Sequence, residues 1–171
     1  TYEISLEDLE ELVELARFSP TGGNRQPLKF VLSADAETNA AIFRCTHWAG
    51  ALKDWGGPEE GERPTAYVVI LGDTEIRKSI GCDHGIAAQS IMLGATEKGL
   101  GGCMLGALNR SDLLEILELP ERYDILLVLA IGKPDETVIL EPMPAEGETK
   151  YWRDEQGDHH VAKRSIDELI L

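Results

Sequence analysis

The sequence predicts an α+β fold in which helices and a sheet form layers, and three observations support this. Some segments repeat apolar residues at helical spacing, whereas others are short apolar runs of strand length. The two kinds of segment are mixed without a regular βαβ alternation. No glycine fingerprint follows the first predicted strand, so a dinucleotide-binding Rossmann domain is not supported.

The first predicted element is an amphipathic helix. Ser5 and Asp8 form a capping box, and apolar residues then recur at helical spacing as far as Pro20. A turn at 21–24 separates this helix from the apolar run 28–32, which has the length of a strand.

The middle of the chain continues with a weak helical pattern at 36–47, a polar loop at 55–64 and an apolar strand at 66–71. Asp83 is placed to cap the helix 84–98 that follows. Because this helix has little polar face, we expect it to be buried on nearly all sides, at the centre of the protein or at a subunit interface.

The last regular elements are an apolar segment at 103–108, a helix at 111–117 that ends before Pro120, and a strand at 125–131. The tail then changes character.

Residues 141–160 contain two prolines, two glycines and many acids, so we expect them to form no core of their own. A loop of this length is usually functional. Residues 165–171 regain apolar character, and we expect them to pair with a sheet edge, either of this chain or of a partner.

Length and charge limit the possible functions. At 171 residues the chain has the size of one domain, and we expect a single domain over 1–171. A formal net charge of −15 argues against nucleic acid and anionic lipid as partners, because both require clustered lysine and arginine. No apolar run approaches the roughly 20 residues of a membrane-spanning helix.

Cysteine and histidine usage indicates neither disulfides nor a metal site. Cys45, Cys82 and Cys103 lack paired spacing, which favours a reducing, cytoplasmic location. The four histidines are not spaced as metal ligands, so we expect no metal.

Three segments carry residue types suited to ligand binding. The turn SPTGGNRQP at 19–27 combines side-chain amides with glycines that let a backbone approach a ligand. A glycine-rich stretch covers 99–106, without the lysine of a phosphate-binding loop. Lys163 and Arg164 form a basic pair, and arginine suits phosphate. An ordinary turn, a helix cap and a solvated charge pair are the respective alternatives.

The sequence lacks hydrolase motifs such as GxSxG or HExxH, and no acid, base and nucleophile constellation is evident. This pattern is typical of an enzyme whose cofactor performs the chemistry. Five motifs, in order, resemble the FMN-dependent nitroreductase family: SPTGGNRQP before a strand, GCDHGIAAQSIMLGA, KGLGGCMLG, AIGKP and HHVAKRS. The resemblance covers nearly the whole chain. It implies a nitroreductase-like three-layer sandwich, with a mostly antiparallel mixed sheet flanked by helices and an extended C-terminal arm.

The resemblance also implies where FMN binds. The matching positions lie in the first turn, after the buried helix and in the tail: Pro20, Thr21, Gly22, Asn24, Gln26, Leu105, Gly106, Ala107, Lys163 and Arg164. Asn24 and Gln26 are the expected side-chain contacts. The backbone of Gly106 and Ala107 is expected near flavin N5, and no side chain is implied as catalytic. Arg164 matches the family's basic residue near the phosphate.

Three further expectations concern the surroundings of the flavin. Lys29 is a candidate for a charge near the ring, although strand alternation equally allows it to point into solvent. Trp48 and Trp55, in the loop WAGALKDWGGP, are predicted to line the substrate pocket as part of a lid, or alternatively to anchor that loop. Family members also carry an N-terminal Arg-x-Ser-x-Arg type segment, which we expect to precede Thr1 in the full protein; weak FMN binding is the alternative.

The implied activity is ping-pong reduction of a small aromatic acceptor, such as a nitroaromatic compound or a quinone, by NADH or NADPH through FMN. The implied assembly is a homodimer with the flavin at the interface and residues 141–171 embracing the partner. The apolar helix 84–98 and the long polar tail favour such an assembly independently. A reductive dehalogenase is an alternative among enzymes, and a non-catalytic flavin-binding module is an alternative outside them.

Overall fold

The computed structural model describes every residue except Thr1, Lys53 and Asp54. The described residues form two compact units. The first contains those up to Trp48 together with Pro58–Pro134, and the second contains those of Ala49–Gly57 together with Asp135–Leu171. The single domain and the arm over 141–171 both stay predictions.

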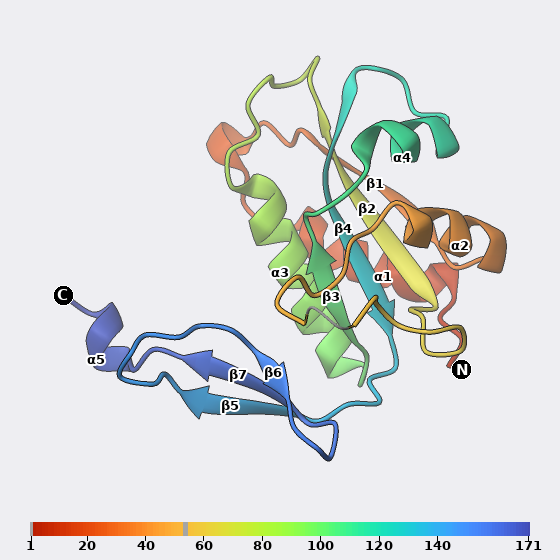
Figure 1. Cartoon of the computed structure of the whole chain (residues 1–171). Helices are drawn as coiled ribbons and strands as arrows, with labels where there is room; N and C mark the ends of the chain where they lie inside the picture. The colour runs from red at the N-terminus through yellow and green to blue at the C-terminus, as the bar shows by residue number, and fades with distance from the viewer. Residues whose placement is uncertain (1, 53–54) are drawn as a thin grey trace. The chain divides into compact units, whose positions relative to one another are not determined.

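A four-stranded antiparallel sheet forms the middle layer of the first unit (Figure 1). Its order is β1-β2-β4-β3, built from β1 (Leu28–Ser33), β2 (Ala66–Asp73), β4 (Tyr123–Gly132) and β3 (Gly101–Leu105). The strand predicted at 66–71 is confirmed as β2, and all of its residues are buried. Its apolar run fits this position, because a central strand covered on both faces has no polar side.

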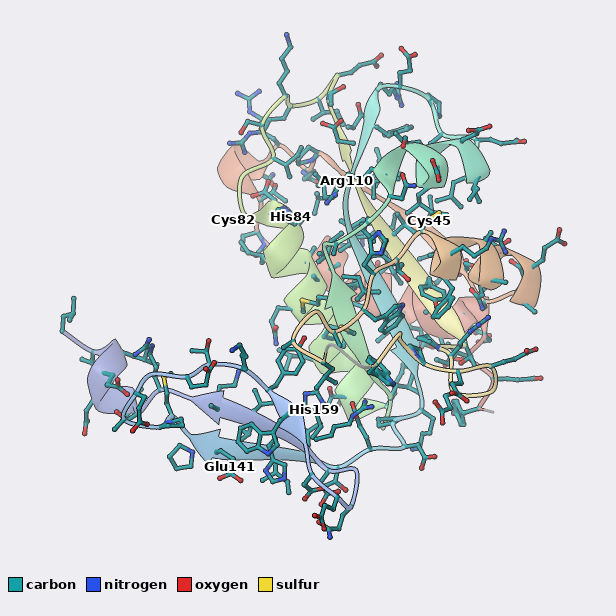
Figure 2. The ribbon with its side chains drawn as sticks, viewed as in Figure 1. Cys45, Cys82, His84, Arg110, Glu141 and His159 are labelled. Carbon is teal, nitrogen blue, oxygen red and sulfur yellow. The ribbon has the colours of Figure 1, made fainter. Side chains whose placement is uncertain are left out.

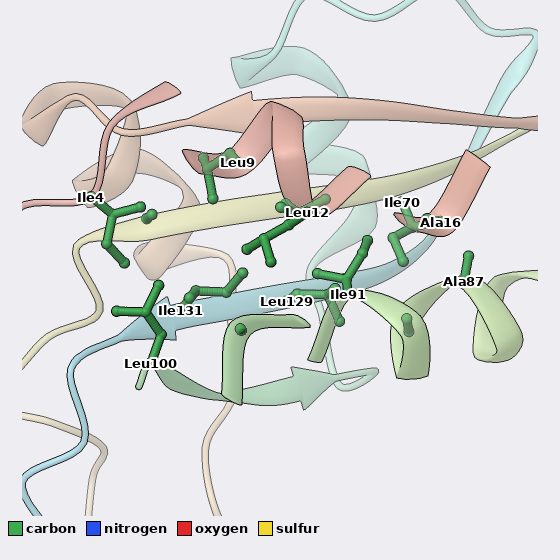
Figure 3. Packing of buried hydrophobic residues seen from close by; sticks show 14 residues of the cluster. Ile4, Leu9, Leu12, Ala16, Ile70, Ala87, Ile91, Leu100, Leu129 and Ile131 are labelled. Carbon is green, nitrogen blue, oxygen red and sulfur yellow. The ribbon is translucent and has the colours of Figure 1, made fainter. Parts of the chain in front are cut away.

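Helices cover both faces of this sheet. The four helices are α1 (Leu6–Arg17), α2 (Ala36–Arg44), α3 (Asp83–Glu97) and α4 (Arg110–Ile116). Val68 and Ile70 of β2 pack in the cluster that contains residues of α1 and α3 (Figure 3), whereas Tyr67 and Val69 pack in the cluster with α2 and α4. Strand alternation therefore builds two cores on one sheet. The predicted α+β fold, with an antiparallel sheet flanked by helices, is confirmed.

The capping box predicted for the first helix is present. The Ser5 hydroxyl accepts a hydrogen bond from the Asp8 N–H at 3.1 Å, and the Asp8 carboxylate accepts one from the Ser5 N–H at 3.0 Å. Leu9, Leu12 and Ala16 are buried against the sheet, as their spacing predicts.

The structure differs from two predictions about the helix at 84–98. Asp83 does not cap it: Cys82 holds the N-cap position, and the Asp83 carboxylate accepts from the Gly22 N–H instead. The helix is also less buried within this chain than expected. Its inner side packs on the sheet through Ile91, whereas Ile86 is 36% and Leu93 is 62% exposed. One chain therefore covers only one side of an apolar helix.

The second unit has its own small sheet. It contains β5 (Val138–Pro142), β6 (Trp152–Arg153) and β7 (His159–Lys163) in the order β5-β7-β6, with β5 and β7 parallel and β6 and β7 antiparallel. None of the described residues at 141–160 is buried, as expected of a tail that forms no core of its own. Stacked rings nevertheless connect the strands of this unit, Tyr151 on His159 and Trp152 on His160, at centroid distances of 5.2 and 5.0 Å.

Residues 165–171 do not pair with a sheet edge of this chain, and their pairing with a sheet edge of a partner stays a prediction. These residues include a short helix, α5 (Ile166–Leu169). Glu168 accepts hydrogen bonds from the N–H and the hydroxyl of Ser165, at 3.0 and 3.3 Å. This capping arrangement starts a helical turn and overrides the apolar pattern that suggested a strand.

Candidate functional site

The predicted cofactor-binding turn is a closed, strained loop between α1 and β1, with a 3₁₀ turn η1 at Gly22–Asn24. Thr21 closes it twice: its carbonyl accepts from the Asn24 N–H at 2.8 Å, and its hydroxyl accepts from the Gln26 N–H at 3.0 Å. Asn24 and Gln26 have φ values of 53° and 51°. Such left-handed backbone costs a non-glycine residue on the order of 1 kcal/mol, and it concentrates at functional sites.

This turn presents polar groups outward. Asn24 and Gln26 are both exposed, whereas the following Pro27 is buried. The Gln26 side-chain amide donates to the backbone carbonyl of Asn24 at 3.4 Å, so the Gln26 side chain folds back onto the turn. The turn therefore has the form expected of a ligand-binding loop on a rigid support.

The turn is clamped to the start of α3. The Gly22 N–H donates to Asp83 Oδ1 at 3.0 Å, and the Gly22 carbonyl accepts from Arg77 Nη1 at 3.3 Å. Arg77 Nη1 also lies 3.8 Å from Asp83 Oδ2. Figure 2 marks this end of α3 with Cys82 and His84.

A second exposed corner follows β3. Leu105 is buried, and Gly106 and Ala107 are exposed after it. The Gly106 carbonyl accepts from Arg110 Nη2 at 3.1 Å, and the Ala107 carbonyl accepts from the His47 N–H at 3.0 Å. The protein thus fixes these two peptide groups through their carbonyls.

Space is open at Gly106. A Cβ added there would approach only Leu127 Cδ1, at 3.9 Å, which is an ordinary contact. The protein's own packing therefore does not require glycine at this position. A planar group that approaches from outside would explain the glycine, because a side chain would block it.

Strand register places the turn and this corner at the same end of the sheet. Leu28, which follows the turn, pairs with Gly72 at the end of β2. The neighbouring Leu71 pairs with Ile125 near the start of β4, and the Ile125 carbonyl accepts from Arg110 Nε at 3.0 Å. Because β3 runs antiparallel to β4, its last residue also lies toward this end.

Uncompensated positive charge lies beside the turn. Arg25 and Lys29 are exposed, and within the part of the chain that the structure describes neither has a carboxylate in ion-pair distance. Lys29 follows the side of β1 on which Val31 packs toward α2 and α4. In a chain of net charge −15, two such cations favour an anion at this end of the sheet.

The basic pair predicted for the phosphate belongs to the second unit. Lys163 is the last residue of β7, and its carbonyl accepts from the Met143 N–H at 2.9 Å. Arg164 is exposed and donates to Glu168 at 3.3 Å, one helical turn away. A surface pair of this kind is weak and leaves the guanidinium available to a stronger anion.

The two tryptophans of the predicted lid are held in different units. Trp48, in the first, donates to the Thr46 hydroxyl at 2.9 Å and lies 5.8 Å from the Phe43 ring. Trp55, in the second, lies under the Arg153 guanidinium at 4.6 Å. Lys53 and Asp54 of the same loop lie outside the described residues. The lid stays a prediction, and the Trp48 contacts fit the anchoring alternative.

Sequence reasoning missed Arg77 and Arg110 as parts of the site and gave Asp83 the wrong role. Arg77 and Asp83 act on Gly22, which is distant in sequence, so no local motif reveals them. Arg110 links the nearby Gly106 carbonyl to the Ile125 carbonyl of another strand, a contact that no local motif reveals either. For Asp83 the signal in the sequence was the segment GCDHG. An acidic residue at the start of a helix is typical of a helix cap, and that role was therefore predicted.

Metal-binding clusters and membrane-spanning helices are both absent from the described residues. Among the described residues, no group of three or more His, Cys, Asp or Glu side chains is arranged to hold a metal ion. Within the same residues, no helix combines the length and apolar character needed to cross a membrane.

Comparisons with known proteins agree with this fold. The model of the nitroreductase family matches residues 1–55 and 63–133. The chain is 25% identical over 167 residues to an oxygen-insensitive NADPH nitroreductase of Helicobacter pylori, covering 77% of this chain and 79% of that protein. It is 26% identical over 188 residues to a 5,6-dimethylbenzimidazole synthase of Rhodospirillum rubrum, covering 94% and 85%.

A solved structure has the same fold. The FMN-dependent nitroreductase from Clostridium difficile superposes with a TM-score of 0.64 at 24% identity, covering 79% of each chain. Because the family model matches most of the sequence, the chain belongs to the nitroreductase family, and it is an oxidoreductase.

Proposed function

We propose that this protein binds FMN and uses NADH or NADPH to reduce nitroaromatic compounds, quinones or similar small aromatic acceptors. The observation that carries the proposal is the strained turn at residues 21–26, which presents Asn24 and Gln26 beside Arg25 and Lys29, two cations with no carboxylate partner among the described residues. Relatives named as an NADPH nitroreductase and an FMN-dependent nitroreductase support the cofactor and the reductant.

The residues present fit FMN. Asn24 and Gln26 offer amide donors and acceptors to the polar edge of a flavin. The corner at Gly106 and Ala107 gives close access to backbone groups, since no side chain covers Gly106. Arg25, Lys29 and the tail cations Lys163 and Arg164 are the candidates for phosphate binding, through charge-assisted hydrogen bonds.

Bound FMN would supply the redox chemistry, accepting a hydride from the nicotinamide and passing electrons to the acceptor in a second half-reaction. The protein's own part is to bind, orient and tune. Peptide dipoles held in place through Arg110 and His47 are preorganised to stabilise negative charge on the ring. Lys29 adds a positive charge on the same end of the sheet.

We also propose that the functional unit is a homodimer. The outer side of α3 exposes Ile86 and Leu93, and a two-fold contact would cover the same apolar surface on both copies. Residues 141–171 would form the arm that embraces the partner, with FMN bound at the interface. A chain with few cations would thus bring cations from two copies to each phosphate.

The proposal is tested by titrating the purified full-length protein with FMN and then adding NADH or NADPH with a nitroaromatic or quinone acceptor. We expect saturable FMN binding and acceptor reduction with parallel-line, ping-pong kinetics. Binding without turnover would instead identify a non-catalytic flavin-binding module. Turnover only with halogenated aromatic compounds, with release of halide, would identify a reductive dehalogenase.

A further inference from the structure

We infer that Asp83 and Arg77 are positioning residues that hold the cofactor-binding turn through both polar groups of the Gly22 peptide. This inference rests on the proposed function, because it assigns their contacts to the FMN site. Asp83 accepts from the Gly22 N–H at 3.0 Å, and Arg77 donates to the Gly22 carbonyl at 3.3 Å. Arg77 and Asp83 approach each other at 3.8 Å, so the three groups form a closed triangle.

Asp83 is buried, so its carboxylate depends on the groups that surround it. Asp83 is only 4% exposed, and an ionised carboxylate at such a position requires partners. Its Oδ1 accepts from the Gly22 N–H, whereas its Oδ2 makes no hydrogen bond among the described residues and lies 3.8 Å from Arg77 Nη1. The carboxylate also lies at the N-terminus of α3, where the helix dipole favours a negative charge. Removing either partner would leave the buried Asp83 carboxylate less compensated.

The segment that carries Arg77 is itself tied to the turn. The Arg77 N–H donates to the Asp73 carbonyl at 3.0 Å, and the Asp73 N–H donates to the Pro27 carbonyl at 2.8 Å. The turn is therefore held at two points, Gly22 near its start and Pro27 at its end. Between these points lie Asn24 and Gln26, the two residues with left-handed backbone.

The glycine at position 22 is explained by the same contacts. A Cβ there would collide with the Arg77 guanidinium. Gly22 thus permits Arg77 to reach the carbonyl, and Arg77 with Asp83 fixes the peptide plane. Strained conformations persist only where their surroundings hold them, and here these two side chains provide the surroundings. A turn held in its binding conformation before the ligand arrives loses less entropy on binding.

The test uses the full chain and compares Asp83→Ala with Asp35→Ala. Asp35 caps α2 by accepting from the Thr38 N–H at 2.8 Å, so the control also removes an aspartate that holds a backbone N–H. FMN affinity is measured by quenching of flavin fluorescence, and the stability of the apoprotein by thermal unfolding. A purely structural role would lower the melting temperature of both variants and leave the FMN Kd unchanged.

We expect Asp83→Ala to weaken FMN binding by at least about tenfold, equivalent to about 1.4 kcal/mol, and Asp35→Ala to leave the Kd as in the wild type. Asp83→Asn keeps a side-chain oxygen for Gly22 and should bind FMN more tightly than Asp83→Ala. If Asp83→Ala does not fold, Arg77→Gln takes its place in the comparison with Asp35→Ala. We expect Arg77→Gln to fold, because the Arg77 side chain is 37% exposed.

An unchanged Kd in the folded Asp83→Ala or Arg77→Gln protein would overturn the inference while leaving the proposed function intact. An equal loss of affinity in Asp35→Ala would also overturn it. A wild-type protein that binds no FMN would overturn the proposed function and this inference together, so the two failures are distinguishable.

Discussion

Leu93 gives a quantitative test of the proposed homodimer. It lies in α3 and is 62% exposed in the single chain. Burying a leucine fully stabilises by about 1.5–3 kcal/mol, so covering the exposed part of Leu93 contributes about 1–2 kcal/mol in each subunit. A two-fold interface contains two copies, which gives about 2–4 kcal/mol for each dimer.

Replacing Leu93 by alanine removes most of this contribution. We expect the dissociation constant of the dimer to rise by about 10- to 100-fold, since about 1.4 kcal/mol corresponds to a factor of ten. Analytical ultracentrifugation over a range of concentrations measures this directly. At subunit concentrations below the dissociation constant of the dimer, the melting temperature should change little, because the Leu93 side chain is exposed in the monomer.

Ile116→Ala is the matched control for Leu93→Ala. Ile116 is an aliphatic residue, 39% exposed, at the end of α4 on the opposite side of the sheet. It should leave the dissociation constant unchanged. A wild-type protein that stays monomeric at micromolar concentration with FMN would refute the reasoning, and so would equal effects of the two substitutions.

Three further predictions concern the tail and the tryptophans. Arg164→Ala should raise the FMN Kd by about tenfold or more but hardly lower the melting temperature of the apoprotein, because the Arg164 ion pair among the described residues is an exposed one with Glu168. A large stability loss with unchanged FMN affinity would mean that its role is structural. The Glu141 and Asp154 carboxylates accept hydrogen bonds from the His160 ring and raise the pKa of His160. Their stabilisation of the sheet formed by β5, β6 and β7 should therefore be complete below about pH 6.5 and lost as pH rises through the raised pKa. Amide hydrogen exchange across that range measures this loss, and the dependence should be absent in His160→Gln. Replacing both Trp48 and Trp55 by leucine should raise KM for aromatic acceptors, and unchanged kinetic constants for every acceptor tested would remove the lid hypothesis.

Local patterns predicted the elements of the first unit well. The strands at 66–71 and 125–131 and the helix that begins after Ser5 appear close to their expected bounds, because each depends on its own periodicity or capping residues. The positions of the turn residues also followed from sequence. Its strained backbone did not, since Asn24 and Gln26 adopt left-handed values that only the surrounding contacts impose.

The errors arose where a residue's partner is distant in sequence or where two local signals compete. Asp83 is of a residue type that is typical of helix caps, but its carboxylate accepts a hydrogen bond from the Gly22 N–H, 61 positions away. At 165–171 the apolar pattern suggested a strand, and the Ser165 and Glu168 capping contacts favoured a helical turn. The small sheet of the second unit was missed because ring stacking and its short strands leave little periodic signal.

The absorption spectrum of the full-length protein as purified tests the central claim most directly. We expect a flavin band that is lost on heating, with the released flavin co-eluting with FMN in chromatography at one equivalent per chain. Release of FAD alone, or the absence of flavin even after reconstitution with FMN, would contradict the assignment of this turn and corner as a flavin site.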